Sequence, residues 1–229
     1  MTQNKKTLVR KTTRINAYLA EKNIASRREA DGMIRSGLVF INGKRAELGA
    51  QIGPKDTVTV SKQNQKQYVY YAYNKPTGIV TIGAQNKEKE IRHITKFPER
   101  VYPVGRLDKE SHGLLILTND GRIVKKLLDP KYTHEKEYIV KVDKLVTDSF
   151  IKKMSEGIIL DGYKTKKAIV KKIHENAFNI ILTEGKNRQI RRMCQTLGYR
   201  VLDLQRIRIM NIKLGSLKPG TYRKIKVAI

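Results

Sequence analysis

A chain of 229 residues with 39% hydrophobic and 30% charged residues can bury a core and has the composition of a globular protein. Its net charge of +27, from 48 Lys and Arg against 21 Asp and Glu, favours a polyanionic partner, nucleic acid before an anionic membrane. The single cysteine excludes a disulfide framework and a Cys-rich zinc site, and the four histidines are scattered without the spacing of metal ligands. The chain has no long apolar run and no signal peptide, so no membrane span is expected. A metal-free cytoplasmic monomer is the prediction.

The first part of the chain predicts a basic arm followed by two helices. Residues 1–11 are predicted to be flexible, and the spacing of apolar residues over 14–20 predicts a short helix. Ser26 and Glu29 have the spacing of a capping box, in which each side chain satisfies the backbone N–H of the other residue. The helix that they begin is expected to end at Gly37, since glycine is favoured just past a helix end.

The residues after the second helix predict a hairpin. An apolar strand over 38–41 leads into Asn42-Gly43, a strong hairpin-turn signal, and a strand over 56–60 completes a small α+β unit. Basic side chains gather on this unit, either as a solvated surface or as contacts to phosphate groups. The candidate residues for contact with a polyanion are Arg14, Arg27, Arg28, Arg35 and Lys44.

Residues 12–62 resemble the S4 RNA-binding domain. The resemblance rests on four segments in order, Arg14-Ile-Asn-Ala-Tyr-Leu19, Ala25-Ser-Arg-Arg-Glu-Ala30, Ile34-Arg-Ser-Gly37 and Val39-Phe-Ile-Asn-Gly-Lys44. It implies binding to RNA, whereas the charge pattern alone implies only binding to a polyanion.

A polar linker over residues 63–67 is predicted to lead into a second domain over residues 68–229. Apolar and β-branched runs predict strands at 68–73, 114–118, 137–142, 177–182 and 201–214, and helical spacing predicts helices at 123–128 and 187–197. Because strands dominate and do not alternate regularly with helices, the predicted fold class is α+β.

Asp108 follows Gly105-Arg106-Leu107 in a loop ahead of a buried strand, a position from which reactive groups are often presented. By itself, Asp108 could equally form a structural pair with an arginine or cap a turn. In each case the basic surroundings are expected to keep it ionised. An ionised aspartate suits nucleophilic attack or electrostatic stabilisation and is a poor general acid.

Four motifs in the second domain resemble the RsuA-like pseudouridine synthases. They are Asn74-Lys-Pro-Thr-Gly-Ile79, the segment from Pro103 through Asp108 to Gly121, His134-Glu-Lys-Glu-Tyr138 and Glu184-Gly-Lys-Asn-Arg-Gln-Ile-Arg-Arg-Met193. With the S4-like module, the resemblance covers the chain from residue 12 almost to its end, and implies a catalytic domain built on a mixed, mainly antiparallel sheet. Residues 188–194 and 204–211 look most like the F-type large-subunit rRNA synthases.

The resemblance implies an enzyme that isomerises uridine to pseudouridine in structured RNA. It implies that Asp108 attacks the target uridine, that Arg106 fills the space of the flipped-out nucleotide, and that Arg191 pairs with Asp108. Tyr138 is expected to stack on the base and assist proton removal at C5. Further RNA contacts are expected from Lys75, Arg188 and Arg192.

The chemistry agrees with these residue types, because isomerisation requires neither a redox change nor hydrolysis and so needs no metal or cofactor. The target must also leave the base stack, which calls for an inserted side chain and a stacking surface. Many relatives carry histidine at the position of Arg188, so its role stays open, as does the modified uridine: 23S rRNA is favoured over 16S rRNA or tRNA. A non-catalytic RNA-binding or ribosome-assembly factor is the alternative from another class.

Overall fold

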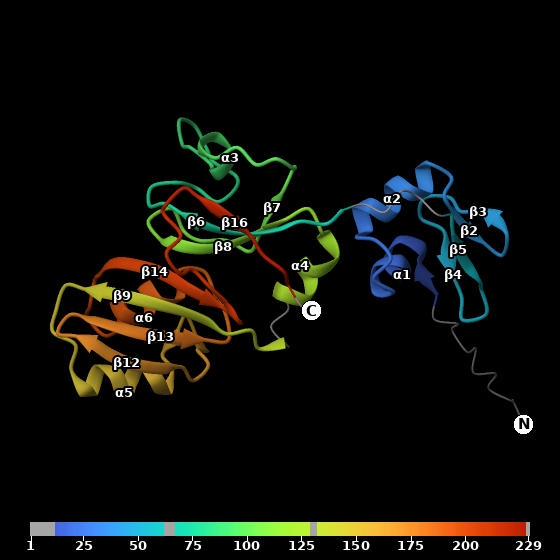
Figure 1. Cartoon of the computed structure of the whole chain (residues 1–229). Coiled ribbons are helices and arrows are strands. Elements are labelled where there is room, and N and C mark those ends of the chain that lie inside the picture. The colour runs from blue at the N-terminus through green and yellow to red at the C-terminus, as the bar shows by residue number, and fades with distance from the viewer. Residues whose placement is uncertain (1–11, 62–66, 129–131, 228–229) are drawn as a thin grey trace, which may run out of the picture. The chain divides into compact units, whose positions relative to one another are not determined.

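The computed structural model describes residues 12–61, 67–128 and 132–227. The chain divides into two compact units: one comprises the residues up to Gln67 together with Asp120–Arg122, and the other comprises the remaining residues from Tyr68 onward (Figure 1). The predicted arm over residues 1–11 and the linker residues 63–66 lie outside the described residues. In the described part of the chain, no helix has both the length and the apolar character needed to cross a membrane.

The first unit packs two helices against short strands. Its elements are β1 (Thr13–Arg14), α1 (Ile15–Glu21), α2 (Arg27–Arg35), β2 (Val39–Ile41), β3 (Lys44–Arg45), β4 (Gln51–Ile52) and β5 (Val58–Val60). The order β3-β2-β5 forms one sheet, and β1 pairs with β4. The predicted capping box begins α2: the Ser26 amide donates to the Glu29 carboxylate at 3.0 Å, and the Glu29 amide donates to the Ser26 hydroxyl at 3.3 Å.

The second unit is built on a nine-stranded sheet with the order β12-β13-β9-β14-β8-β6-β16, to which β7 and β15 add at the edges of β8 and β14. Every pairing is antiparallel except that of β14 with β8. The strands are β6 (Tyr70–Lys75), β7 (Tyr102–Val104), β8 (His112–Thr118), β9 (Lys136–Val142), β12 (Ile169–His174), β13 (Ala177–Leu182), β14 (Val201–Ile209), β15 (Ile212–Lys213) and β16 (Tyr222–Lys224). The predicted α+β class and mainly antiparallel sheet are confirmed.

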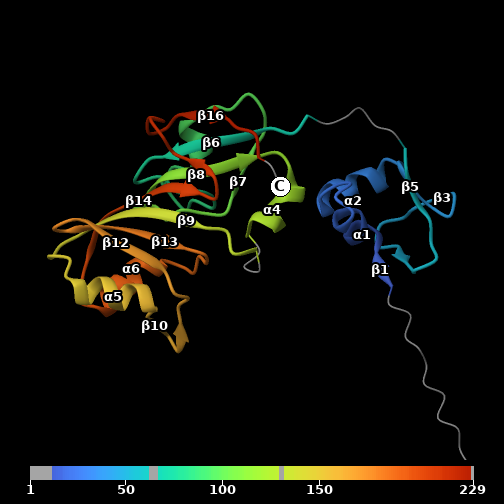
Figure 2. The same cartoon turned by 60° about the horizontal axis from the view of Figure 1, so that its bottom comes forward.

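Helices cover both faces of this sheet. On one face, α5 (Asp148–Glu156) and α6 (Gln189–Thr196) bury their apolar side chains against β9 and β13 (Figure 2). The opposite face of β8 packs against α4 (Gly121–Leu128), through Leu114, Ile116 and Ile123. The remaining short elements are α3 (Ile91–Ile94) and the pair β10 (Ile159–Leu160) and β11 (Tyr163–Lys164).

No element was predicted over residues 143–176, where the structure has α5 and three strands. Local signals for α5 are nevertheless present. The hydroxyl of Thr147 caps the helix by accepting from the amide of Phe150, and Phe150 and Met154 are buried at helical spacing. Gly157 follows the helix with φ of 91°, a conformation that favours glycine.

Candidate active site

The loop between β7 and β8 presents Asp108 and is held on both sides of it. Before Asp108, the backbone of Leu107 exchanges two hydrogen bonds with the hydroxyl of Thr81, which donates to the carbonyl at 2.6 Å and accepts from the amide at 3.1 Å. After Asp108, the Lys109 carbonyl accepts from the amide of Gly78 at 2.8 Å. The half-buried Asp108 side chain is therefore carried by a backbone with little freedom to move, as preorganised catalysis requires.

The predicted RNA contact Lys75 lies inside the protein, so this prediction is wrong. Its side chain is 0% exposed, and the ammonium donates to the carbonyls of Pro76 at 2.9 Å and Ile79 at 2.6 Å and reaches that of Lys109 at 3.4 Å. Burial lowers the pKa of the amine to about 8, and the charge of Asp108 opposes this shift. Because β6 ends here among inward-turned carbonyls, Lys75 supports the Asp108 loop and cannot reach a phosphate.

A row of residues crosses the sheet beneath this loop. Tyr138 on β9 faces Arg206 on β14, Arg206 faces Gly113 on β8, and Gly113 faces Lys75 on β6. Partners in register project from the same face of a sheet, so Tyr138, Arg206 and Lys75 share one face. Gly113 has φ of 103°, and an added Cβ would overlap the Arg206 carbonyl oxygen, so only glycine allows β8 and β14 to approach this closely.

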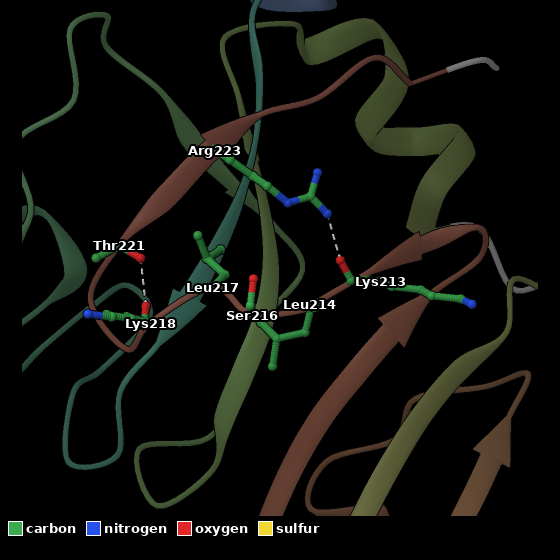
Figure 3. A pocket seen from close by; sticks show the side chains of 8 residues that line it. Lys213, Leu214, Ser216, Leu217, Lys218, Thr221 and Arg223 are labelled. Carbon is green, nitrogen blue, oxygen red and sulfur yellow. Dashed lines mark hydrogen bonds between the residues drawn. The ribbon is translucent and has the colours of Figure 1, made fainter.

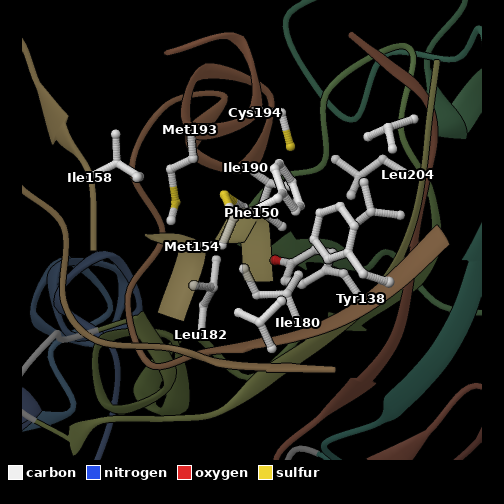
Figure 4. Packing of buried hydrophobic residues seen from close by; sticks show 14 of the residues in the cluster. Tyr138, Phe150, Met154, Ile158, Ile180, Leu182, Ile190, Met193, Cys194 and Leu204 are labelled. Carbon is white, nitrogen blue, oxygen red and sulfur yellow. The ribbon is translucent and has the colours of Figure 1, made fainter. Parts of the chain in front are cut away.

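Tyr138 belongs to the hydrophobic cluster under α5 and α6, which also contains Leu107 from the Asp108 loop. Figure 4 shows its ring beside Leu204 and Ile180. The side chain is 8% exposed, and its hydroxyl has no hydrogen-bond partner among the described residues. Tyr138 is therefore a core residue that lies opposite Arg206 in the sheet, and its predicted part in base stacking stays a prediction.

The start of α6 brings arginines to Glu110, two residues after Asp108. The Arg188 guanidinium donates to the Glu110 carboxylate at 2.6 Å, and this bond holds the pKa of Glu110 below its usual range. Arg191 donates to the Glu110 carbonyl at 3.1 Å and the Ser111 hydroxyl at 3.4 Å. Within the described ranges, Asp108 forms no ion pair with Arg191, because this guanidinium is turned toward the residues that follow Asp108.

The other predicted contacts lie at the surface or partly exposed. Arg106 is exposed beside Asp108, whereas the half-buried Arg192 forms an ion pair with Asp161. In the first unit, the exposed candidates are Arg14, Arg27, Arg28, Arg35 and Lys44. Their accessibility agrees with a contact to RNA, which stays a prediction.

Sequence reasoning missed several residues of the site. Thr81 and Glu110 hold the loop and its arginines, and Arg206 lies in the row under it. The sequence offered one signal for Arg206. Side chains alternate between the two faces of a strand, so Arg206 on β14 is expected on the same face as the apolar Leu204, which is buried.

A hollow of about 420 Å³ near β15 and β16 lies apart from these residues and contains none of the predicted catalytic ones (Figure 3). Its lining is Lys213, Leu214, Gly215, Ser216, Leu217, Lys218, Thr221 and Arg223. No group of three or more metal-ligating side chains occurs in the described ranges.

Two family models match the chain: that of the RNA pseudouridylate synthases over residues 69–196 and that of the S4 domain over residues 13–58. The first contains the Asp108 loop, α6, and Lys75, Gly113 and Tyr138 of the row, whereas Arg206 lies beyond its end. The chain belongs to the RNA pseudouridylate synthase family. It is therefore an enzyme that isomerises uridine to pseudouridine in RNA, as the four motifs predicted.

Similar proteins span most of this synthase. The dual-specificity RNA pseudouridine synthase RluF of Escherichia coli K12 is 46% identical over 219 residues, which cover 93% of this chain and 76% of the relative. The ribosomal large subunit pseudouridine synthase B of Bacillus subtilis 168 is 34% identical over 223 residues, 93% of this chain and 91% of the relative. A solved pseudouridylate synthase is 29% identical with a TM-score of 0.69, covering 93% of this chain and 96% of that one.

Proposed function

We propose that this synthase modifies a specific uridine of ribosomal RNA, in the large subunit, with Asp108 as its nucleophile. The substrate is supported by the Bacillus relative, which is named for the ribosomal large subunit. The observation that carries the role of Asp108 is the loop itself, whose backbone is bonded to Thr81 before the carboxylate and to Gly78 after it.

In the proposed reaction, the Asp108 carboxylate attacks C1′ of the target uridine and the C1′–N1 bond breaks. The bonding pair leaves with the base, so negative charge passes from the carboxylate to uracil. The base then rotates, C5 forms the new bond to C1′ as the ester to Asp108 breaks, and the C5 proton is lost while N1 gains one. Atoms and charge balance over this sequence without an external reagent.

Three further residues have proposed parts. Exposed Arg106, two residues before the nucleophile, fills the gap left in the RNA helix when the target leaves the stack. Tyr138 borders the base and assists removal of the C5 proton. Arg191 already binds the residues after Asp108 and pairs with its carboxylate in the RNA complex.

The test compares wild type with Asp108→Asn on base-labelled ribosomal RNA fragments. Asp108→Asn is expected to abolish pseudouridine formation while RNA binding persists, and the same change at exposed Asp148 on α5 serves as the matched control. Full activity of Asp108→Asn would disprove the assignment. Mapping pseudouridines in cells with and without the protein then identifies the site, and a modified uridine found only in 16S rRNA or tRNA would replace the large-subunit substrate.

A further inference from the structure

Arg206 is a buried cation that pairs with no anion among the described residues. Its side chain is 5% exposed, its Nε donates to the Leu114 carbonyl at 2.7 Å, and one Nη nitrogen is buried without any partner. No carboxylate lies within ion-pairing distance of it among the residues that the structure describes. Its neighbour on β14, Arg208, is paired with both Glu135 and Glu137, so this chain does provide acids for a guanidinium on the same strand.

Other cations surround Arg206. Its charge contributes to lowering the pKa of Lys75 and of Lys136, in each case after the larger effect of burial. An unpaired charge in a buried position is costly, and like charges nearby increase the cost. Buried charges without a compensating partner are tolerated where function requires them, so this arginine is a candidate for a functional role. The charges of Asp108 and Arg206 both act on the ammonium of Lys75, which has a place in the same row as Arg206.

We infer that Arg206 supplies the positive charge that stabilises the uracil anion formed when the C1′–N1 bond of the target breaks. The inference rests on the proposed role of Asp108. Before the attack, the negative charge of the site is on the Asp108 carboxylate; after it, the aspartate is a neutral ester and the charge is on the base. A fixed cation opposite Tyr138, the proposed neighbour of the base, lowers the barrier because it favours the second state over the first and needs no rearrangement during the reaction.

The row of residues supports this assignment. Tyr138, the proposed neighbour of the base, faces Arg206 directly across β9 and β14. Gly113, the next position in the row, has no side chain that could come between Arg206 and the Asp108 loop. The positive charge of Arg206 also explains why the detached base stays in the site until it attacks through C5. The charge attracts the uracil anion, whereas neutral uracil would be free to leave.

The experiment measures how much the rate depends on the stability of the leaving base. Single-turnover rates at saturating RNA are compared for wild type, Arg206→Met and Arg206→Lys, on RNA with uridine or 5-fluorouridine at the target. Fluorine stabilises the base anion, and consumption of the target nucleotide is followed because the C–F bond blocks loss of a C5 proton. Arg208→Met is the matched control, since it removes the same charge two residues along β14.

Arg206→Met is expected to slow uridine turnover by ~100-fold, the size found for loss of one charge-stabilising donor. The loss on 5-fluorouridine should be several-fold smaller, because the better leaving base needs less stabilisation. Arg206→Lys, which keeps the charge, should retain most of the rate, and Arg208→Met should match wild type. Equal slowing on both substrates would mark Arg206 as merely structural, and no slowing would also overturn the inference.

Two further measurements keep the result clear. Thermal unfolding reports whether Arg206→Met folds; if it does not, Arg206→Gln against Arg206→Lys repeats the comparison between a neutral and a charged side chain. Asp108→Asn is run in parallel on both substrates. If Asp108→Asn is active, the proposed function fails; if it is inactive while Arg206→Met behaves like Arg208→Met, only the role of Arg206 fails.

Discussion

Two groups of cations differ in almost every physical respect. Arg27 and Arg28 lie exposed at the start of α2 in the first unit, whereas Lys75 and Arg206 are buried beneath the Asp108 loop in the second. Exposed cations bind phosphates by releasing counterions, so their effect depends on salt and adds up along the RNA. Buried cations are shielded from salt and act on whatever group lies above them. We therefore expect the exposed cations to set the affinity for RNA and the buried cations to set the rate of the reaction on the target base. Substitutions in each group test this division.

The largest effect is expected from Gly113→Ala, which disturbs the support of the buried cations. The new Cβ would collide with the Arg206 backbone in a conformation that alanine rarely adopts, so the free energy of unfolding should fall by ~3 kcal/mol or more. Gly83→Ala is the control, since φ is 81° there but the space is open, and it should cost only ~1 kcal/mol. Urea unfolding measures both, and equal losses would contradict the close approach of β8 and β14.

Lys75→Met should slow the single-turnover rate at saturating RNA by ~100-fold, because the Lys109 carbonyl loses a donor and the Asp108 loop becomes less well placed. The dissociation constant for RNA should stay the same. The matched control is Lys141→Met at an exposed position of β9, which should leave the rate unchanged. If Lys75→Met instead weakened RNA binding and left the rate unchanged, Lys75 would act as a phosphate contact like Arg27 and Arg28.

The wild-type rate should fall ~10-fold between pH 7 and pH 9, since the pKa of Lys75 is lowered to about 8 and its ammonium loses a proton in this range. Stability should change in the opposite direction. Between pH 8 and the ordinary value of 10.5, the unfolded chain binds more protons at Lys75 than the folded one, so its contribution to the free energy of unfolding rises with pH. A pH–rate profile of Lys75→Met that keeps the same decline would assign it to another group.

Replacing both Arg27 and Arg28 by alanine should weaken RNA binding ~10-fold at moderate salt and reduce the slope of log affinity against log salt by about 2, one for each lost phosphate contact. The single-turnover rate at saturating RNA should not change. Filter binding across a salt series measures the slope. A slope equal to that of wild type would show that these arginines are a solvated helix face.

The smallest effect is expected from Ser26→Ala, which removes the cap of the helix that carries Arg27 and Arg28. Loss of the hydrogen bond from the Glu29 amide should lower the free energy of unfolding of the first unit by ~1 kcal/mol. RNA binding should weaken less than in the double arginine variant, and the saturated rate should be unaffected. A slower saturated rate would mean that the first unit takes part in the chemistry.

Most local features could be predicted from the sequence because neighbouring residues decide them. The capping box at Ser26 and Glu29 and the Asn42-Gly43 turn are formed as expected, and Asn42 and Gly43 both have positive φ. The helix predicted over residues 187–197, which contains Arg191, is also present as α6. The helix α5 was missed although its cap at Thr147 and its buried pair, Phe150 and Met154, were visible in the sequence.

The candidate site was predicted in part. Asp108 could be singled out by its motif, and the structure explains the motif by the hydrogen bonds on either side of it. The partners of the arginines could not be predicted: Glu110, an unremarked neighbour in the sequence, holds Arg188, and Arg191 binds the Glu110 carbonyl. Several acceptors lie within reach of each guanidinium, and the position of α6 against the Asp108 loop decides which of them each arginine binds.

By itself, the sequence determined the family and many of the local elements and singled out Asp108 as a candidate, because motifs, caps and turns depend on residues close together in the chain. Only the tertiary structure decided that Lys75 is an internal support and that Arg206 lies opposite Tyr138 without an ion pair in the described part of the chain. The reason is register. Tyr138, Arg206, Gly113 and Lys75 come from four strands far apart in sequence, and only their pairing in one sheet brings them into a single row.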